Sequence, residues 1–90
     1  MILYRIITED KNRAPLLDLV NKCLTTQGFT AYLATGYWAK SKENSIIIEI
    51  SRQTPIPATI KSIASKIAEL NDQQAVLVQT IPCESELIGR

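Results

Sequence analysis

The order of hydrophobic patterns along this chain restricts its fold more than any other feature of the sequence. Four segments are rich in β-branched and aromatic residues and are expected to be strands: 2–8 (ILYRIIT), 29–39 (FTAYLATGYWA), 45–52 (SIIIEISR) and 75–81 (AVLVQTI). Apolar residues recur at helical spacing from Pro15 onward and again over residues 57–70. The expected order is therefore strand, helix, strand, strand, helix, strand.

The two expected helices each have one apolar face. Pro15 suits the first turn of a helix, and Gly28 is expected to end the first helix in a left-handed conformation. The apolar positions are Leu16, Leu17, Val20, Cys23 and Leu24 in the first helix, and Ile60, Ile63, Ala64, Ile67 and Leu70 in the second. Cys23 and Cys83 lack C-x-x-C spacing, so we expect free thiols, with Cys23 acting as a small core residue.

This order of elements favours one compact arrangement, a ferredoxin-like α+β sandwich. The βαββαβ chain would form a four-stranded antiparallel sheet with two helices on one face. The strands would lie in the order last, first, third, second. A swapped or barrel-like dimer of the same units is an alternative. We expect a single domain over residues 1–82 and a loosely attached tail over 83–90.

The two middle strands are expected to form a hairpin. The polar residues 40–44 would be its turn, with Lys40 opposite Ser45 and Tyr37 opposite Ile48. Because side chains alternate between the faces of a sheet, each residue is assigned to one side. The face expected to pack on the helices carries Ile2, Tyr4, Ile6, Phe29, Leu33, Tyr37, Ile46, Ile48, Ile50, Val76 and Val78.

The opposite face of the sheet is unusually apolar. It would carry Leu3, Arg5, Ile7, Tyr32, Gly36, Trp38, Ile47, Glu49, Leu77, Gln79 and Ile81, whereas a solvated sheet face is normally polar. We therefore expect a homo-oligomer, a dimer or a trimer, in which a second copy covers this face. Arg5 and Glu49 would pair across it and set its register. The alternative is coverage by the chain's own tail, through Leu87 and Ile88.

Composition excludes several classes of function. The chain has ten basic and nine acidic residues, a net charge of +1, and no histidine. This charge is too weak to support non-specific nucleic-acid binding. No apolar stretch approaches the roughly eighteen residues of a membrane span, and residues 1–5 do not resemble a secretion signal, so a cytoplasmic location is expected. Without histidine, the common zinc sites and the Ser-His and Cys-His nucleophiles cannot form, and we expect no metal and no cofactor.

The most site-like residues surround the expected hairpin turn: Tyr37, Trp38, Lys40, Lys42 and Glu43. Trp38 would stack on a planar ligand while the lysines attract phosphate. The alternative is that Trp38 anchors an interface and the lysines solubilise a turn.

Two further sets of charged residues are candidate sites. Residues 9–13, just before the first helix, would offer backbone amides to an anion, although the loop lacks glycine and Pro15 removes one donor. Glu9, Glu43 and Glu49 show no spacing that predicts a carboxylate pair. No catalytic residue is predicted.

The order of elements, the short length and the open sheet face resemble the trimeric signalling proteins of the PII and CutA type. The resemblance spans residues 1–81 and is one of organisation. It implies that Tyr37–Asn44 corresponds to the flexible effector loop between the second and third strands, and that residues 74–78 correspond to the strand after the second helix. Because the glycine-rich and basic nucleotide-binding motifs of that family are absent, the resemblance does not imply nucleotide binding.

These observations predict a small, non-enzymatic, cytoplasmic domain that self-associates through its sheet face and serves as a binding or regulatory module. A first alternative is a nucleic-acid-associated protein that uses Tyr32, Trp38, Lys40 and Lys42. A second is a small enzyme with a site between subunits, using Tyr37 or Glu49.

Overall fold

The computed structural model describes residues 1–25 and 28–89, except for the side chain of Trp38. Its elements are β1 (Ile2–Glu9), α1 (Arg13–Leu24), β2 (Thr30–Trp38), β3 (Ser41–Arg52), α2 (Pro57–Leu70) and β4 (Leu77–Pro82). The predicted order of strands and helices is confirmed.

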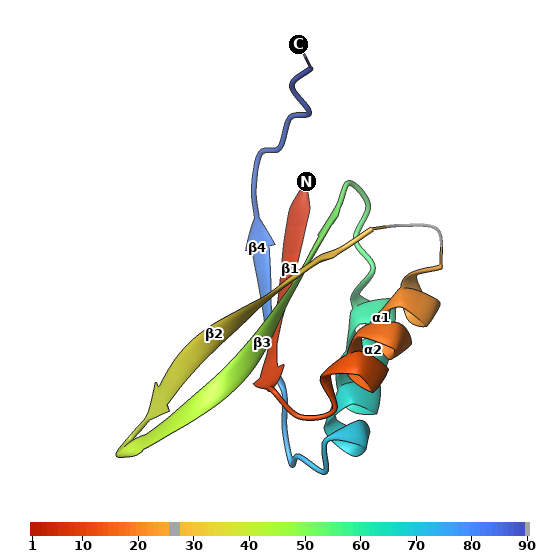
Figure 1. Cartoon of the computed structure of the whole chain (residues 1–90). Coiled ribbons are helices and arrows are strands. Elements are labelled where there is room, and N and C mark those ends of the chain that lie inside the picture. Colours follow the sequence, from red (N-terminus) through yellow and green to blue (C-terminus); the bar gives the residue numbers. More distant parts are fainter. Residues whose placement is uncertain (26–27, 90) are drawn as a thin grey trace.

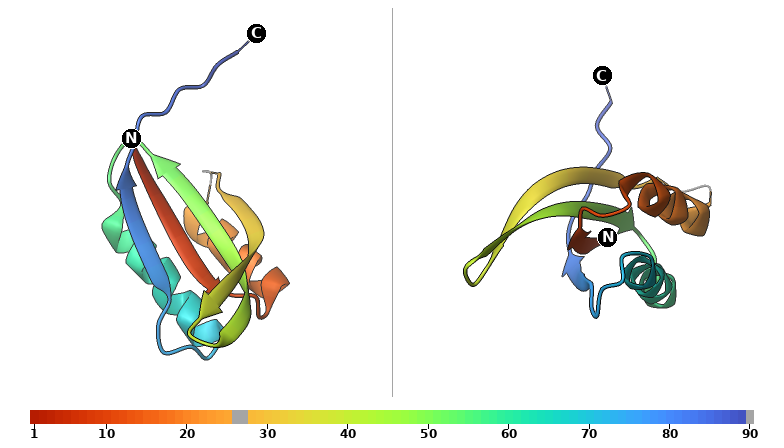
Figure 2. Two further views of the ribbon diagram at one scale, coloured as in Figure 1. Left: turned by 90° about the vertical axis from the view of Figure 1, so that its left-hand side faces the viewer. Right: turned by 60° about the horizontal axis from the view of Figure 1, so that its bottom comes forward.

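The four strands form one antiparallel sheet in the order β2-β3-β1-β4. Both helices lie on the same face of this sheet (Figure 1), and the other face has no helix on it (Figure 2). The predicted ferredoxin-like α+β fold and the predicted strand order are therefore confirmed. Neither helix is long and apolar enough to cross a membrane, as far as the described residues go.

The core lies between the helices and the sheet, where the fully buried residues come from β1 and β3 and Val78 of β4 packs against them. Its buried residues are Tyr4, Ile6, Ile46, Ile48 and Ile50 from the sheet, and Leu16, Val20, Leu24, Ile60, Ile63 and Ile67 from the helices. Alternate residues of β1 and β3 enter it, as a period of two requires. The hydroxyl of Tyr4 accepts a hydrogen bond from the backbone N–H of Ile56 at 2.9 Å, which holds the segment that enters α2.

The helix ends differ in detail from the prediction. Helix α1 begins at Arg13, so Pro15 still lies within the first turn, where a missing N–H costs no helical bond. Gly28 does not end the helix: the residue with positive φ at its end is Thr25, with φ 55° and ψ −94°, and its N–H donates to the Asn21 carbonyl at 3.1 Å. Cys23 is half-buried against the core, as expected.

The β2–β3 hairpin is tighter than the polar run 40–44 indicates. Only Ala39 and Lys40 form its turn, and Trp38 pairs with Ser41, so residues 41–44 belong to β3. The predicted pairing of Lys40 with Ser45 is wrong. Two-residue hairpin turns need positive φ, which Ala39 adopts with φ 53° although the turn has neither glycine nor asparagine.

This register makes part of the hairpin project beyond the sheet. Strand β1 ends at Glu9, opposite Ser45, so residues 35–38 and 41–44 pair only with each other. We call residues 35–44 the ribbon; Figure 1 shows it extending away from the helices. Leu33 and Tyr37 were predicted to be core residues, but they are 56% and 74% exposed because the helices do not reach them.

A buried polar cluster joins the end of α2 to the end of β1. Asn71 is 2% exposed, and its Nδ2 donates to Thr8 Oγ1 at 3.2 Å, to the Glu9 carbonyl at 3.3 Å and to Gln73 Oε1 at 3.2 Å. Thr8 Oγ1 also donates to Gln73 Oε1 at 2.5 Å. Asn12 Nδ2 donates to Asn71 Oδ1 at 3.4 Å, so the same cluster reaches the start of α1.

Candidate functional site

The sheet face that points away from the helices is apolar and uncovered by the described residues. We call it the open face. Tyr32, Ile47, Ile7 and Leu77 are successive neighbours across its four strands and form a continuous apolar row. Tyr32 and Leu77 are 42% and 46% exposed, while Ile7 and Ile47 are half-buried.

The tail does not cover the open face. Leu87 and Ile88 are fully or largely exposed, and the chain after β4 runs away from the sheet in both views of Figure 2. Coverage by Leu87 and Ile88, the alternative considered from the sequence, is therefore wrong for the structure described.

An ion pair crosses the open face beside the apolar row. Arg5 Nε lies 2.9 Å from Glu49 Oε2, and Arg5 Nη1 donates to Gln79 Oε1 at 3.4 Å. The predicted pairing of Arg5 with Glu49 is confirmed. Because the positive charge of Arg5 on β1 faces the negative charge of Glu49 on β3, this part of the open face carries no net charge.

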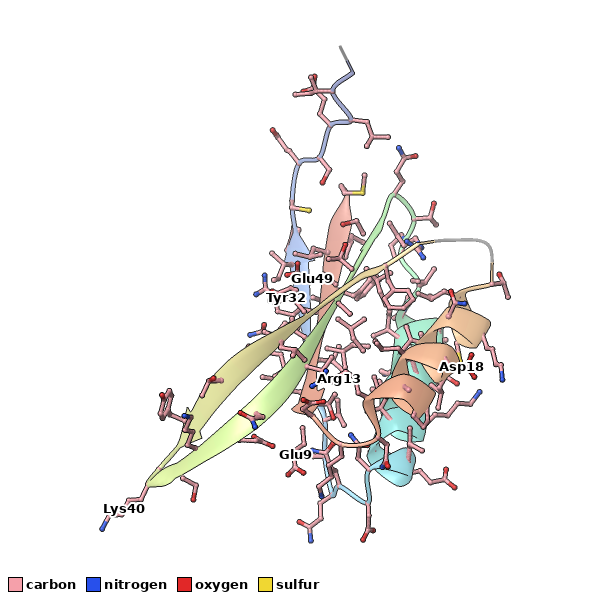
Figure 3. The ribbon with its side chains drawn as sticks, in the orientation of Figure 1. Glu9, Arg13, Asp18, Tyr32, Lys40 and Glu49 are labelled. Atoms are coloured by element: carbon pink, nitrogen blue, oxygen red, sulfur yellow. The ribbon has the colours of Figure 1, made fainter. Side chains whose placement is uncertain are left out.

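The predicted ligand-binding residues lie on the ribbon but do not converge. Tyr37 and Lys42 are directly opposite each other, and Lys40 lies in the turn at the ribbon tip (Figure 3). The side chain of Trp38 lies outside the described part of the chain. Glu43 lines a cleft with groups from β1 and β4. Lys42 and Glu43 also line a shallower hollow together with residues of the 9–11 segment.

This cleft lies at the base of the ribbon and has a volume of about 450 Å³. We call it the basal cleft; its lining includes Ile7, Glu9, Glu43, Ser45, Gln73 and Leu77. Sequence reasoning treated Glu9 and Glu43 as unrelated carboxylates. The observed register brings both side chains into the lining of this cleft. Ser45 and Gln73 were missed because their place depends on that register and on the α2–β4 loop.

The charged side chains of residues 9–13, beside the cleft, pair with one another. Lys11 Nζ lies 2.9 Å from Glu9 Oε2, and Arg13 forms a bidentate ion pair with Asp10. The hydrogen bond from Lys11 lowers the pKa of Glu9, and the hydrogen bond from Arg13 lowers the pKa of Asp10. Since both cations of the loop already bind carboxylates, this arrangement argues against the anion site considered for residues 9–13.

We expect the Glu9 carboxyl to titrate below 4.5 in the folded protein, as measured by NMR of its side-chain carbon. A lowered pKa stabilises the fold above the unfolded value, and that contribution is lost as pH falls through the folded value. Lys11→Met should move the Glu9 pKa back up towards 4.5. Lys22→Met, which removes the partner of Asp18, is the matched control and should leave Glu9 unchanged. An unshifted Glu9 in the unmodified chain would contradict the ion pair.

Comparison with known proteins gives matches of structure alone. No protein-family model matches the sequence, and no curated protein matches it. A DUF3240 family protein from Shewanella baltica OS155 is 11% identical, with TM-score 0.64, over 99% of this chain and 96% of that one. CPII, a nitrogen regulatory PII-like protein from Thiomonas intermedia K12 solved with ADP, AMP and bicarbonate, is 16% identical, with TM-score 0.59, over 96% and 94%.

The chain has the fold of PII-like proteins. The organisational resemblance seen in the sequence is confirmed at this level. A phage SAM lyase in its apo state matches as well, at 16% identity and TM-score 0.61, over 89% of this chain and 78% of that one. A regulatory protein and an enzyme therefore share the fold, and function has to be argued from the surfaces of this chain.

Proposed function

We propose that this protein is a small, non-enzymatic, cytoplasmic binding or regulatory module that works as a homo-oligomer assembled through its open face. The observation that carries the proposal is the continuous apolar row of Tyr32, Ile47, Ile7 and Leu77, which no described part of the chain covers. Apolar patches of this kind on a soluble chain are typical of interaction surfaces.

The charges on the open face favour a second copy as its partner. Arg5 and Glu49 already neutralise each other within one chain, at 2.9 Å. Two such faces can meet without like-charge repulsion, and neither ion is left unpaired when water is removed. A differently charged partner would gain no attraction from this region. The dimer and the trimer both satisfy this condition.

The PII-like fold supports the regulatory part of the proposal. CPII, which shares the fold, is a nitrogen regulatory PII-like protein. In the resemblance drawn from the sequence, the segment Tyr37–Asn44 corresponds to an effector loop, and in this chain it is the projecting ribbon. We propose that the ribbon residues Tyr37, Trp38, Lys40, Lys42 and Glu43 contact a ligand or partner.

Light scattering after size exclusion tests the assembly. We expect a mass of two or three chains at micromolar concentration. Leu77→Ser should weaken assembly by about tenfold or more, because a buried leucine contributes roughly 1.5–3 kcal/mol. The matched control is Leu87→Ser, which alters an equally apolar but fully exposed side chain in the tail and should leave the mass unchanged. A monomeric unmodified chain would overturn the proposal.

A further inference from the structure

The basal cleft combines an apolar wall with a polar rim. Ile7, Val76 and Leu77 form the wall, while the rim carries the carboxylates of Glu9 and Glu43. A volume of about 450 Å³ lies within the range of small-molecule sites, which are usually apolar with a few placed polar groups. All of these residues come from one chain, and Ile7 and Leu77 also belong to the apolar row of the open face.

The charges of the rim favour a cation. The carboxyl groups of Glu9 and Glu43 both line the cleft. Glu9 binds the Lys11 ammonium at 2.9 Å, whereas the ion pairs of the described residues leave Glu43 without a bonded cation. Two carboxylates that line one cleft repel each other, so a second positive charge beside Glu43 would be favoured and an anion disfavoured.

Two neutral groups in the cleft have unused hydrogen-bonding capacity. Ser45 is 3% exposed and lines the cleft, and its hydroxyl has no hydrogen-bond partner among the described residues. Gln73 is oriented by Thr8 and Asn71, which both donate to its Oε1. Arg52 Nε, and not the Ser45 hydroxyl, is the fully buried polar side-chain atom without a partner among the described residues, so water in the cleft reaches Ser45. A ligand that donates a hydrogen bond to Ser45 would take the place of that water.

We propose that the basal cleft binds a small organic cation. Its primary ammonium group would donate to the Glu43 carboxylate and the Ser45 hydroxyl, and a short apolar chain would pack against Ile7 and Leu77. Within the described residues no three Cys, Asp or Glu side chains gather as metal ligands, and Mg²⁺ or Ca²⁺ would need more oxygen ligands than this rim offers. This inference goes beyond the proposed function, and because Ile7 and Leu77 also belong to the apolar row of the open face, it requires that assembly leaves the cleft accessible.

Titration of the isotope-labelled protein with n-hexylammonium chloride, followed by amide NMR, tests the site. We expect saturable shifts at Ile7, Ser45 and Gln73, and none of these shifts with sodium hexanoate, which has the same chain but the opposite charge. Glu43→Gln should weaken hexylammonium binding about tenfold, since it removes a hydrogen bond to a charged group. Glu69→Gln, an exposed change on α2, is the matched control and should leave the affinity unchanged.

Three results would overturn the proposal: no saturable shift with hexylammonium, equal affinity in Glu43→Gln and the unmodified chain, or saturable shifts of the same amides with hexanoate or calcium chloride. Ser45→Ala provides a second variant, which should weaken binding while keeping both carboxylates. Light scattering on the same samples reports the oligomer separately, so a failure of the ligand proposal is distinguishable from a failure of the assembly proposal.

Discussion

Asn71→Leu is expected to lower the free energy of unfolding by about 3 kcal/mol, because it removes the donor at the centre of a buried polar cluster. Leucine has the same branching and number of heavy atoms but cannot donate to Thr8, Gln73 or the Glu9 carbonyl. These groups would lose a partner while Asn71's position remains 2% exposed, so water replaces the lost bonds poorly.

Urea unfolding monitored by circular dichroism measures this change. Asn21→Leu is the matched control, because Asn21 is exposed on α1 and should tolerate the same substitution within about 0.5 kcal/mol. If Asn71→Leu unfolded at the same urea concentration as the control, the cluster would contribute little to stability and the contacts between α2 and β1 would have to be apolar.

Arg5→Leu is expected to weaken the proposed homo-oligomer by about a hundredfold or more. In the free chain the ion pair is partly solvated, with side-chain exposures of 31% for Arg5 and 23% for Glu49. In an assembled face the remaining Glu49 carboxylate would be buried without its partner, a change that typically costs about 2–5 kcal/mol. Light scattering over a dilution series measures the loss.

The double variant Arg5→Leu/Glu49→Leu separates the cost of burying an unpaired carboxylate from the effect of changing the shape of the open face. It leaves no unpaired charge and should recover most of the affinity, since apolar replacement of a buried ion pair is often neutral or stabilising. Lys22→Leu breaks the exposed pair with Asp18 on α1 and should not change the assembly. Equal assembly of Arg5→Leu and the unmodified chain would mean that Arg5 stays solvated in the oligomer.

The sequence predicted the faces of the sheet better than its register. Tyr37 was expected opposite Ile48 and lies opposite Lys42, six positions earlier in β3. Because that shift is an even number, every β2 side chain keeps its predicted face, and the pairing of Arg5 with Glu49 was unaffected. The polar run Lys40–Asn44 indicated the hairpin turn, and this placed the turn wrongly. These residues are polar because both faces of the ribbon are in contact with solvent.

The basal cleft could not be predicted for the same reason. It requires Glu43 and Ser45 beside Glu9, which follows only from the observed register, and it requires Gln73, which is placed by Asn71 and Thr8 from other elements. Neither hydrophobic periodicity nor residue spacing reports such tertiary polar contacts. A tail over the open face was the alternative that composition left open, and the course of residues 83–89 decided against it.

Two-stranded β-structure is only marginally stable by itself, so rigidity decreases along β2 and β3 from Ser45 outward to the turn. The backbone N–H of Asp10 donates to the Asn44 carbonyl at 2.8 Å and marks where the stiff portion ends. A molecule that binds Lys40 contacts the flexible tip of the ribbon, which can adapt its conformation to the ligand. A molecule that binds at Glu43 contacts the base of the ribbon, where its bending begins. Binding there would restrict the directions in which the ribbon can bend.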